Sequence, residues 1–156
     1  MLMHALSNEI RLTARLVDSL YLEALVLADE VRGYFDEIGR ADRDTLPPLQ
    51  RVAFSCESLK VTTRLMHVIA WLLTRRAVEH GEISIAQARA PSRRLGMAAD
   101  SDPTTVMLLP EAAQTLIEAS RDLYARVERL DQDIDMPMEP VPSPARSLLS
   151  RLERAF

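Results

Sequence analysis

The 156-residue chain is poor in the residues that form sheets and disulfides. It has 4 glycines, 4% aromatic residues and a single cysteine, Cys56. Because glycines and aromatics are so few among many Leu, Ala and Arg residues, we predict an all-α protein and not a sheet protein. One cysteine cannot form an intramolecular disulfide and suits a reducing compartment, so we expect a cytoplasmic protein.

A long apolar run is also lacking. Residues 65–73, the most apolar stretch, are far fewer than the roughly 20 residues of a membrane span. Glu9, Arg11 and Arg15 interrupt the N-terminal segment, which has no basic start before an apolar core, so we expect no secretory signal. A net charge of -4 gives no overall field toward nucleic acid or an anionic membrane.

Motifs of catalytic and metal sites are missing too. The sequence contains no glycine-rich phosphate loop, no HExxH, no CxxC and no ExxH pair. His67 and Cys56 lie about three turns apart on one predicted helix, too far for a nucleophile–base pair. We therefore expect no enzyme activity, no metal and no cofactor, and we interpret Cys56 as a small buried residue.

Apolar residues that recur every three or four positions predict three long helices. The first follows the capping pair Ser7-Asn8 and runs to Ile38, with Gly39 as its stop. The second and third are predicted over residues 47–80 and 110–134. Between them lies an insertion with a short helix that Ser84 can cap, followed by an irregular segment.

The second predicted helix carries two apolar stripes, so it is either the centre of the bundle or also a dimer surface. We interpret Trp71 as an anchor in the core or at a subunit interface, together with Met66, Leu72 and Leu73. The first stripe is Leu49, Val52, Cys56, Leu59, Thr63, Met66, Ala70, Leu73 and Ala77, and the second is Phe54, Val61, Leu65, Val68 and Leu72.

Arg64 lies between these two stripes. Glu57 is two turns earlier on the same side, and Lys60 and Arg75 extend this flank. Two interpretations stay open. The flank is a solvated strip, or Arg64 forms a partly buried ion pair with an acid on another helix, such as Glu23 or Glu30.

The segment after Met136 differs from the rest in composition. Residues 137–144, PMEPVPSP, hold four prolines and predict an extended linker. Beyond it, Leu148, Leu149, Leu152 and Phe156 share one face of a short amphipathic helix that is too short to be stable alone. We therefore predict a bundle domain over residues 1–136 and a tail over residues 137–156, which docks either on the bundle or on a partner.

The stretch ESLKVTTRLMHVIAWLLTRRAVEHGE, residues 57–82, resembles the RcdA-like family of alphaproteobacterial proteins, the regulators of CtrA degradation. LYARVERLD, residues 123–131, and the first helix support the resemblance, which covers most of residues 20–135. The residues that match the main motif are Glu57, Ser58, Thr62, Thr63, Arg64, Leu65, Met66, Trp71, Leu72, Leu73, Arg76, Ala77, Val78, Gly81 and Glu82.

The resemblance implies an antiparallel three-helix bundle that forms a homodimer and has no catalytic activity. It also implies an adaptor of the ClpX–ClpP protease. Such an adaptor links a response-regulator-type priming protein on the ClpX unfoldase to cargo, including a cell-cycle transcription regulator, and uses its C-terminal tail in delivery.

We accordingly expect regulated proteolysis through protein binding, without nucleic acid or membrane. The alternatives are a DNA-binding regulator that uses the arginine loop at residues 84–97, although Pro91 interrupts its recognition helix, and a structural binding protein unrelated to proteolysis. The candidate partner-binding residues are Glu57, Arg64, Arg75, Arg76, Glu82, Leu148, Leu149, Leu152 and Phe156.

Overall fold

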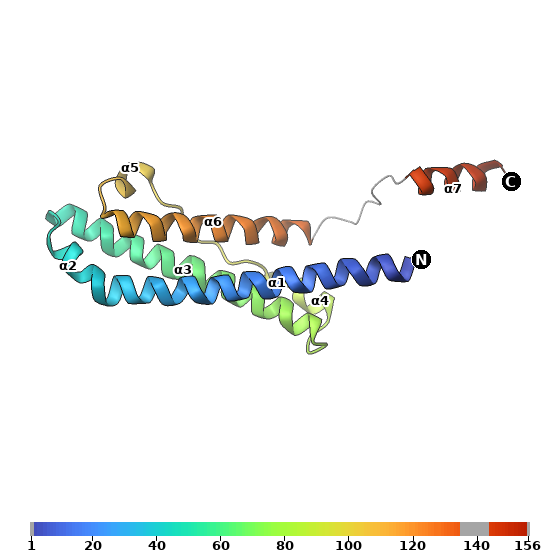
Figure 1. The fold of residues 1–156 in the computed structure, drawn as a ribbon, viewed down its shortest axis with the longest axis horizontal. Coiled ribbons are helices and arrows are strands. Elements are labelled where there is room, and N and C mark those ends of the chain that lie inside the picture. Colours follow the sequence, from blue (N-terminus) through green and yellow to red (C-terminus); the bar gives the residue numbers. More distant parts are fainter. Residues whose placement is uncertain (1, 135–143, 156) are drawn as a thin grey trace.

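The computed structural model of the chain describes residues 2–134 and 144–155 and contains helices and no strand within these ranges. Three long helices form a bundle: α1 (Leu2–Gly33), α3 (Pro48–Glu79) and α6 (Glu111–Asp133) (Figure 1). The predicted all-α, three-helix fold is confirmed. None of the described helices is both long enough and apolar enough to span a bilayer.

The first helix begins and ends at other places than its sequence suggests. It starts at Leu2, ahead of the cap expected at Ser7, and it does not stop at Gly39. Instead it passes through a π-helical turn, η1 (Tyr34–Ile38), into α2 (Gly39–Asp44). The extra residue of the π turn rotates the helix face, and Ile38, expected in the core seam, is 74% exposed.

Gly39 permits a close backbone approach rather than ending a helix. Its N–H donates to the Tyr34 carbonyl, and a Cβ at this position would lie 2.7 Å from that oxygen and 3.1 Å from two Tyr34 ring carbons. Tyr34 in turn donates a hydrogen bond to Asp42 and packs its ring edge-on against Phe35. Gly39 is therefore needed for the corner that joins α1 to α3.

We expect Gly39→Ala to lower the free energy of unfolding by about 1–3 kcal/mol, because the new methyl group meets a backbone oxygen that cannot move aside. Urea unfolding measures the change. Gly33→Ala is the matched control, since nothing lies within 4 Å of its Cβ and a helical Ala should stabilise by about 0.5–1 kcal/mol. Equal stabilities for the two variants would contradict this interpretation of Gly39.

The long helices do not all alternate in direction. α1 runs antiparallel to both α3 and α6, whereas α3 and α6 run the same way (Figure 1). The bundle is therefore antiparallel through α1, with α3 and α6 as its parallel pair. The cause is the connection between them: α3 ends at Glu79, two residues before Gly81, whose φ of +72° suits a glycine stop, and the chain then returns along the whole bundle before α6 begins.

This returning segment contains three short helices: α4 (Ile85–Ala88), the 3-10 turn η2 (Pro91–Arg93) and α5 (Pro103–Val106). The predicted cap at Ser84 is confirmed, since its side chain accepts from the Gln87 N–H while the Gln87 side chain accepts from the Ser84 N–H. α5 was not predicted. Asp102 caps it by accepting from the Thr104 N–H.

The core lies between the three long helices. Of the two α3 stripes, the second is the one that faces inward, and Trp71 and Leu72 are buried with it. Met66 and Leu73, expected as anchors, are 64% and 46% exposed and lie outside the core. The inward-facing residues of the other two helices include Val17, Leu20, Ala24, Leu27 and Val31 of α1 and Ala113, Leu116, Ile117, Leu123 and Val127 of α6.

The tail contains a further helix, α7 (Pro144–Ala155). Pro144, counted with the linker in the sequence, is its first residue. The linker residues 137–143, the boundary between the two predicted domains and Phe156 lie outside the described residues.

Candidate functional site

The first apolar stripe of α3 faces outward along nearly the whole helix. Leu49 is 85% exposed, Leu59 is 69% exposed and Met66 is 64% exposed, and Cys56, expected to be buried, is exposed as well. From Leu49 to Leu73 the stripe extends about 36 Å at 1.5 Å per residue. We call this surface the α3 stripe; it comprises Leu49, Val52, Cys56, Leu59, Thr63, Met66, Ala70 and Leu73.

The flanks of the α3 stripe are nearly without charge. The positions beside it are Ala53, Ser55, Lys60, Thr62, His67, Ile69 and Thr74, of which Lys60 alone is a formal cation. The threonine hydroxyls do not depend on water, because Thr62, Thr63 and Thr74 each donate to a carbonyl one turn earlier in α3. This face can lose its water at low cost, as a protein–protein contact requires.

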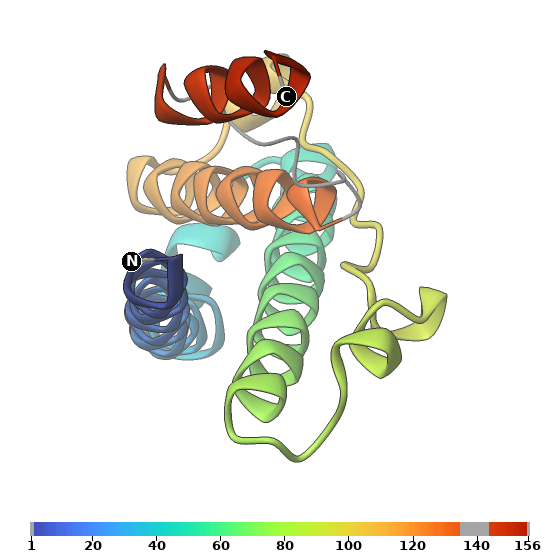
Figure 2. The ribbon, with the colours of Figure 1, turned by 90° about the vertical axis from the view of Figure 1, so that its right-hand side faces the viewer.

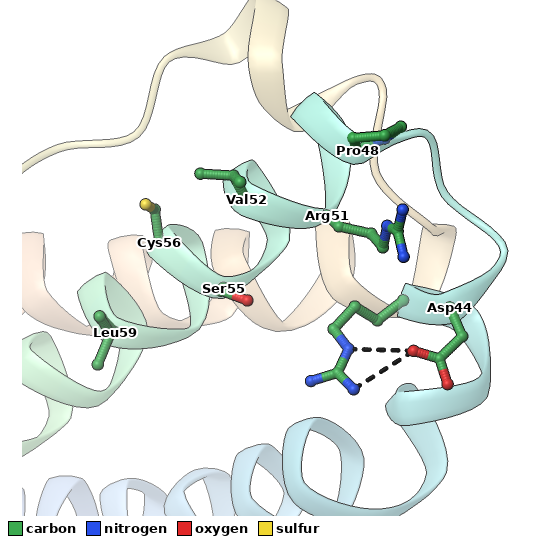
Figure 3. Close-up of a pocket in the computed structure, with 8 residues that line it drawn as sticks. Asp44, Pro48, Arg51, Val52, Ser55, Cys56 and Leu59 are labelled. Carbon is green, nitrogen blue, oxygen red and sulfur yellow. Dashed lines mark hydrogen bonds and ion pairs between the residues drawn. The ribbon is translucent and has the colours of Figure 1, made fainter.

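A groove of about 530 Å³ lies at the α2 end of the stripe. Val52, Cys56 and Leu59 project from successive turns of α3 along it, while Arg51 and the Arg43–Asp44 pair stand at its rim (Figure 3). The arrangement is an apolar floor with a mostly basic edge. It can accept apolar side chains of another protein, with acidic groups preferred at the periphery.

Beneath the exposed surface, α3 contributes two charged side chains to the interior. Glu57 and Arg64 are each 2% exposed. Ser101 lies between them: its hydroxyl donates to Glu57 Oε2 at 2.5 Å and accepts from Arg64 Nη2 at 2.6 Å. Arg64 also donates to the Ser120 hydroxyl and to the Ala99 carbonyl. Burial lowers the pKa of the Arg64 guanidinium, and the nearby Glu57 and Asp100 carboxylates partly offset this.

These contacts correct two expectations. The predicted partner-binding role of Glu57 and Arg64 is wrong for the folded bundle, because their side chains are enclosed and bound within it. Arg64 is no part of a solvated strip. Its acids are neither Glu23 nor Glu30: Asp100 lies 4.0 Å from its guanidinium, and Glu57 of its own helix is reached through Ser101. No sequence signal pointed to Ser101, which lies in the irregular part of the returning segment.

We call residues 94–101 the strap, since this segment forms hydrogen bonds and ion pairs with side chains of both α3 and α6. Arg94 forms an ion pair with Asp131 at 2.8 Å, and Tyr124 donates to the Gly96 carbonyl. Gly96 lies directly on the His67 ring, where a Cβ would be 2.7 Å from Nδ1. Together with Arg64, these contacts fix the strap along its length. The strap therefore extends the rigid surface around the α3 stripe.

Asp131 joins the strap, α3 and α6. Its carboxylate accepts from Trp71 Nε1 at 2.9 Å, from Arg94 Nε and from the Leu95 N–H. Burial raises the pKa of Asp131, but the hydrogen bonds from Arg94, Trp71 and Leu95 outweigh it, so the pKa lies below its usual value of 3.8. Trp71 is thus an anchor of the core with a polar partner.

Asp131→Asn is expected to reduce stability at pH 7 by about 1–3 kcal/mol. Because the folded-state pKa is depressed, the contribution of the carboxylate is complete above pH 3.8 and is lost as the pH falls through the lower folded-state value. Urea unfolding of both proteins as a function of pH tests this, with the exposed Asp133→Asn as control. A difference between wild type and Asp131→Asn that stays constant down to pH 2 would contradict a pKa of Asp131 lowered by folding.

The other candidate residues lie apart from one another. Arg75 stacks on the Trp71 ring at 5.2 Å, and Arg76 lies over the Tyr21 ring at 4.5 Å and 3.4 Å from Asp18. Both are half-buried at the far end of α3, and Glu82 is exposed in the turn beyond. In α7, Leu148, Leu149 and Leu152 are exposed by 55–59%. The candidate residues thus lie on two exposed apolar surfaces, the α3 stripe and α7, or near the far end of α3.

The arginine loop does not form a helix-turn-helix. α4 has four residues and η2 has three, and Arg94 is held against Asp131. Within the described residues no group of three or more His, Cys, Asp and Glu side chains could hold a metal ion.

Comparison with known proteins places the chain among relatives. The model of a family described as "Protein of unknown function (DUF1465)" matches residues 8–156. The crystal structure of RcdA from Caulobacter crescentus CB15 is similar, with a TM-score of 0.62 and 33% sequence identity. The similarity covers 76% of this chain and 89% of that chain. No curated protein sequence gives a significant match.

Proposed function

Because the chain belongs to the RcdA-like family (DUF1465), we propose that it is a non-catalytic adaptor, which binds other proteins and helps to deliver them to the ClpX–ClpP protease. The observation that carries this proposal is the pair of exposed apolar surfaces on one chain. An adaptor must hold two proteins at once, and in a dimer joined through the α3 stripe each copy offers its own α7. The role belongs in the cytoplasm, in keeping with the single cysteine.

The two surfaces suit different tasks. The α3 stripe lies on a rigid bundle that the strap and the Glu57–Ser101–Arg64 contacts hold together. α7 is joined to that bundle through residues 135–143. A peptide tethered in this way meets a partner already held by the bundle at an effective concentration of roughly millimolar, so even a weak contact becomes useful.

We propose a second copy of the chain as the partner of the α3 stripe. Three properties support a homodimer: the apolar residues recur at the steps of a helix-pairing seam, the stripe is about 36 Å long, and its flanks carry almost no charge that would repel another copy. Dimer formation would cover Met66 and Leu73, which the bundle leaves exposed.

We propose that α7, with Arg75, Arg76 and Glu82 at the far end of α3, contacts the proteolytic machinery. In this arrangement the partners are ClpX with a response-regulator-type priming protein on one side and a cargo protein, of the cell-cycle transcription-regulator type, on the other. Glu82 is exposed, and parts of Arg75 and Arg76 are accessible.

Capture by immobilised ClpX loaded with the priming protein tests the proposal. The full chain should be retained, whereas Leu148→Glu with Leu152→Glu should reduce retention at least about tenfold, since two charges replace apolar contacts in a small interface. Leu108→Glu, a change of an exposed leucine in the returning segment, is the control and should be retained like the wild type. Absence of retention for the wild type, with active ClpX and priming protein, would refute the adaptor role.

A further inference from the structure

A groove of about 430 Å³ separates α1 from α6 on the side of the bundle away from α3's core contacts. Its floor and walls include Leu22 and Val26 of α1, which are 64% and 52% exposed, and Ala119 of α6. α1 and α6 both pack on α3, but between themselves they leave this apolar strip uncovered. A three-helix arrangement with such a groove has room for a fourth helix.

The rim of this groove is acidic. Glu23, Glu30 and Asp122 line it, against one nearby cation, Arg126, which pairs with both Glu23 and Asp122. The α3 stripe has no such acidic rim: its flanks carry the single cation Lys60, and at its α2 end stand Arg51 and the Arg43–Asp44 pair. An apolar helix with basic flanks therefore fits the α1–α6 groove and is disfavoured on the α3 stripe.

α7 has the matching chemistry. Within its 12 residues, three arginines outnumber one glutamate, and Leu148, Leu149 and Leu152 form an exposed apolar face. A helix of this length is marginal in water without a surface to pack on.

The chain is also long enough for the contact. α6 ends at Asp133, which is about 21 Å along the helix from Ala119 at 1.5 Å per residue. The ten residues from Ile134 to Ser143 can span up to about 33 Å. The helix α7, about 18 Å long, would then lie antiparallel to α6 and cover the groove.

We propose that α7 docks in the α1–α6 groove of its own chain, with its leucines on Leu22 and Val26 and with Arg151 and Arg154 at the acidic rim. The docked helix completes a four-helix arrangement. A protein that binds the apolar face of α7 must first displace α7 from the groove. The affinity of the groove for α7 therefore sets the fraction of molecules in which α7 is free to bind a partner. The inference does not depend on the role in proteolysis.

Disulfide trapping in the full chain tests the contact. In a Cys56→Ser background, Val26→Cys with Leu149→Cys should form an intramolecular disulfide under mild oxidation, at a rate independent of protein concentration. Leu59→Cys with Leu149→Cys is the matched control for docking on the α3 stripe and should form it at least about tenfold more slowly.

Charge reversal tests whether the acidic rim of the groove attracts the arginines of α7. Glu30→Arg with Asp122→Arg should slow trapping of the Val26–Leu149 pair several-fold, and adding Arg151→Glu with Arg154→Glu should restore it. The proposal is overturned if the Leu59 pair forms as fast as the Val26 pair, if the disulfide joins two copies of the chain, or if reversing the charges leaves the rate unchanged. Circular dichroism of each variant checks that the bundle is folded, because Val26 and Leu149 are both exposed and tolerate substitution.

Discussion

Replacing Arg64 by methionine is expected to lower the free energy of unfolding by about 3–5 kcal/mol. The methionine fills a similar volume, but it leaves the buried Glu57 carboxylate with Lys60 as its one remaining cation, and removing one partner from a buried network of charges is among the costliest changes in a protein interior. Ser120 and the Ala99 carbonyl also lose the donor that they share. Urea unfolding monitored by Trp71 fluorescence measures the loss.

The double variant Arg64→Met with Glu57→Leu separates this cause from mere loss of packing. Removing both charges removes the penalty, so the double variant should be more stable than Arg64→Met alone. Lys60 lies 3.2 Å from Glu57 at the surface side and stays in place in both variants. A loss below about 1 kcal/mol for Arg64→Met, or a double variant less stable than the single one, would show that the two charges do not depend on each other.

This result bears on the meaning of the family motif. Glu57 and Arg64 are two of its residues, yet both lie inside the bundle, where they hold the strap to α3 and α6 through Ser101, Ala99 and Ser120. Their contribution to function is therefore indirect: they fix the bundle and the strap that support the exposed surfaces. A variant that loses partner binding at these positions would do so through unfolding or a loosened strap.

Leu59→Glu is expected to weaken self-association at least about 100-fold, or by roughly 3 kcal/mol, while leaving the stability of the bundle nearly unchanged. Leu59 is 69% exposed, so the carboxylate stays in water when the chain is alone. In the proposed symmetric dimer each interface receives two such charges, which must be buried against the apolar α3 stripe.

Sedimentation equilibrium over a range of concentrations measures the association. Met66→Glu, at the other half of the α3 stripe, should have a similar effect, and Leu108→Glu is the control for an added charge at an exposed leucine outside it. If the dimer persists in both variants of the α3 stripe, its interface lies elsewhere on the chain. If the wild-type chain is monomeric at all concentrations, the proposal that a second copy binds the α3 stripe is wrong.

The helices themselves were predictable, because each of the three carries a stripe at three- and four-residue steps and packs by it. Their ends were less so. Gly39 looks like a stop, but it serves a π turn that depends on the Tyr34 carbonyl, a contact five residues away in the chain. Gly81, of the same residue type, does end its helix, because its backbone is left-handed. Composition does not distinguish the two positions.

The candidate surface was found in the sequence but its orientation was not. Both α3 stripes recur at helical spacing, so the pattern alone does not say which one faces α1 and α6. In the bundle it is the second stripe that is buried, and the long returning segment allows α3 and α6 to run in the same direction. Figure 2 shows that segment passing on the outer side of α3 and α6. The partners of Arg64 lie on it and on α6, and no local pattern predicts such contacts.

Protein turnover in the source cells, measured by pulse labelling and mass spectrometry, tests the adaptor role most directly. Without the chain, a small set of proteins should be degraded several-fold more slowly, and the same proteins should be stabilised when ClpX is depleted. The wild-type chain should restore their turnover, whereas the Leu148→Glu, Leu152→Glu variant should not. If no protein changes its half-life on removal of the chain, or if the affected proteins are degraded independently of ClpX, the chain is not an adaptor of this protease.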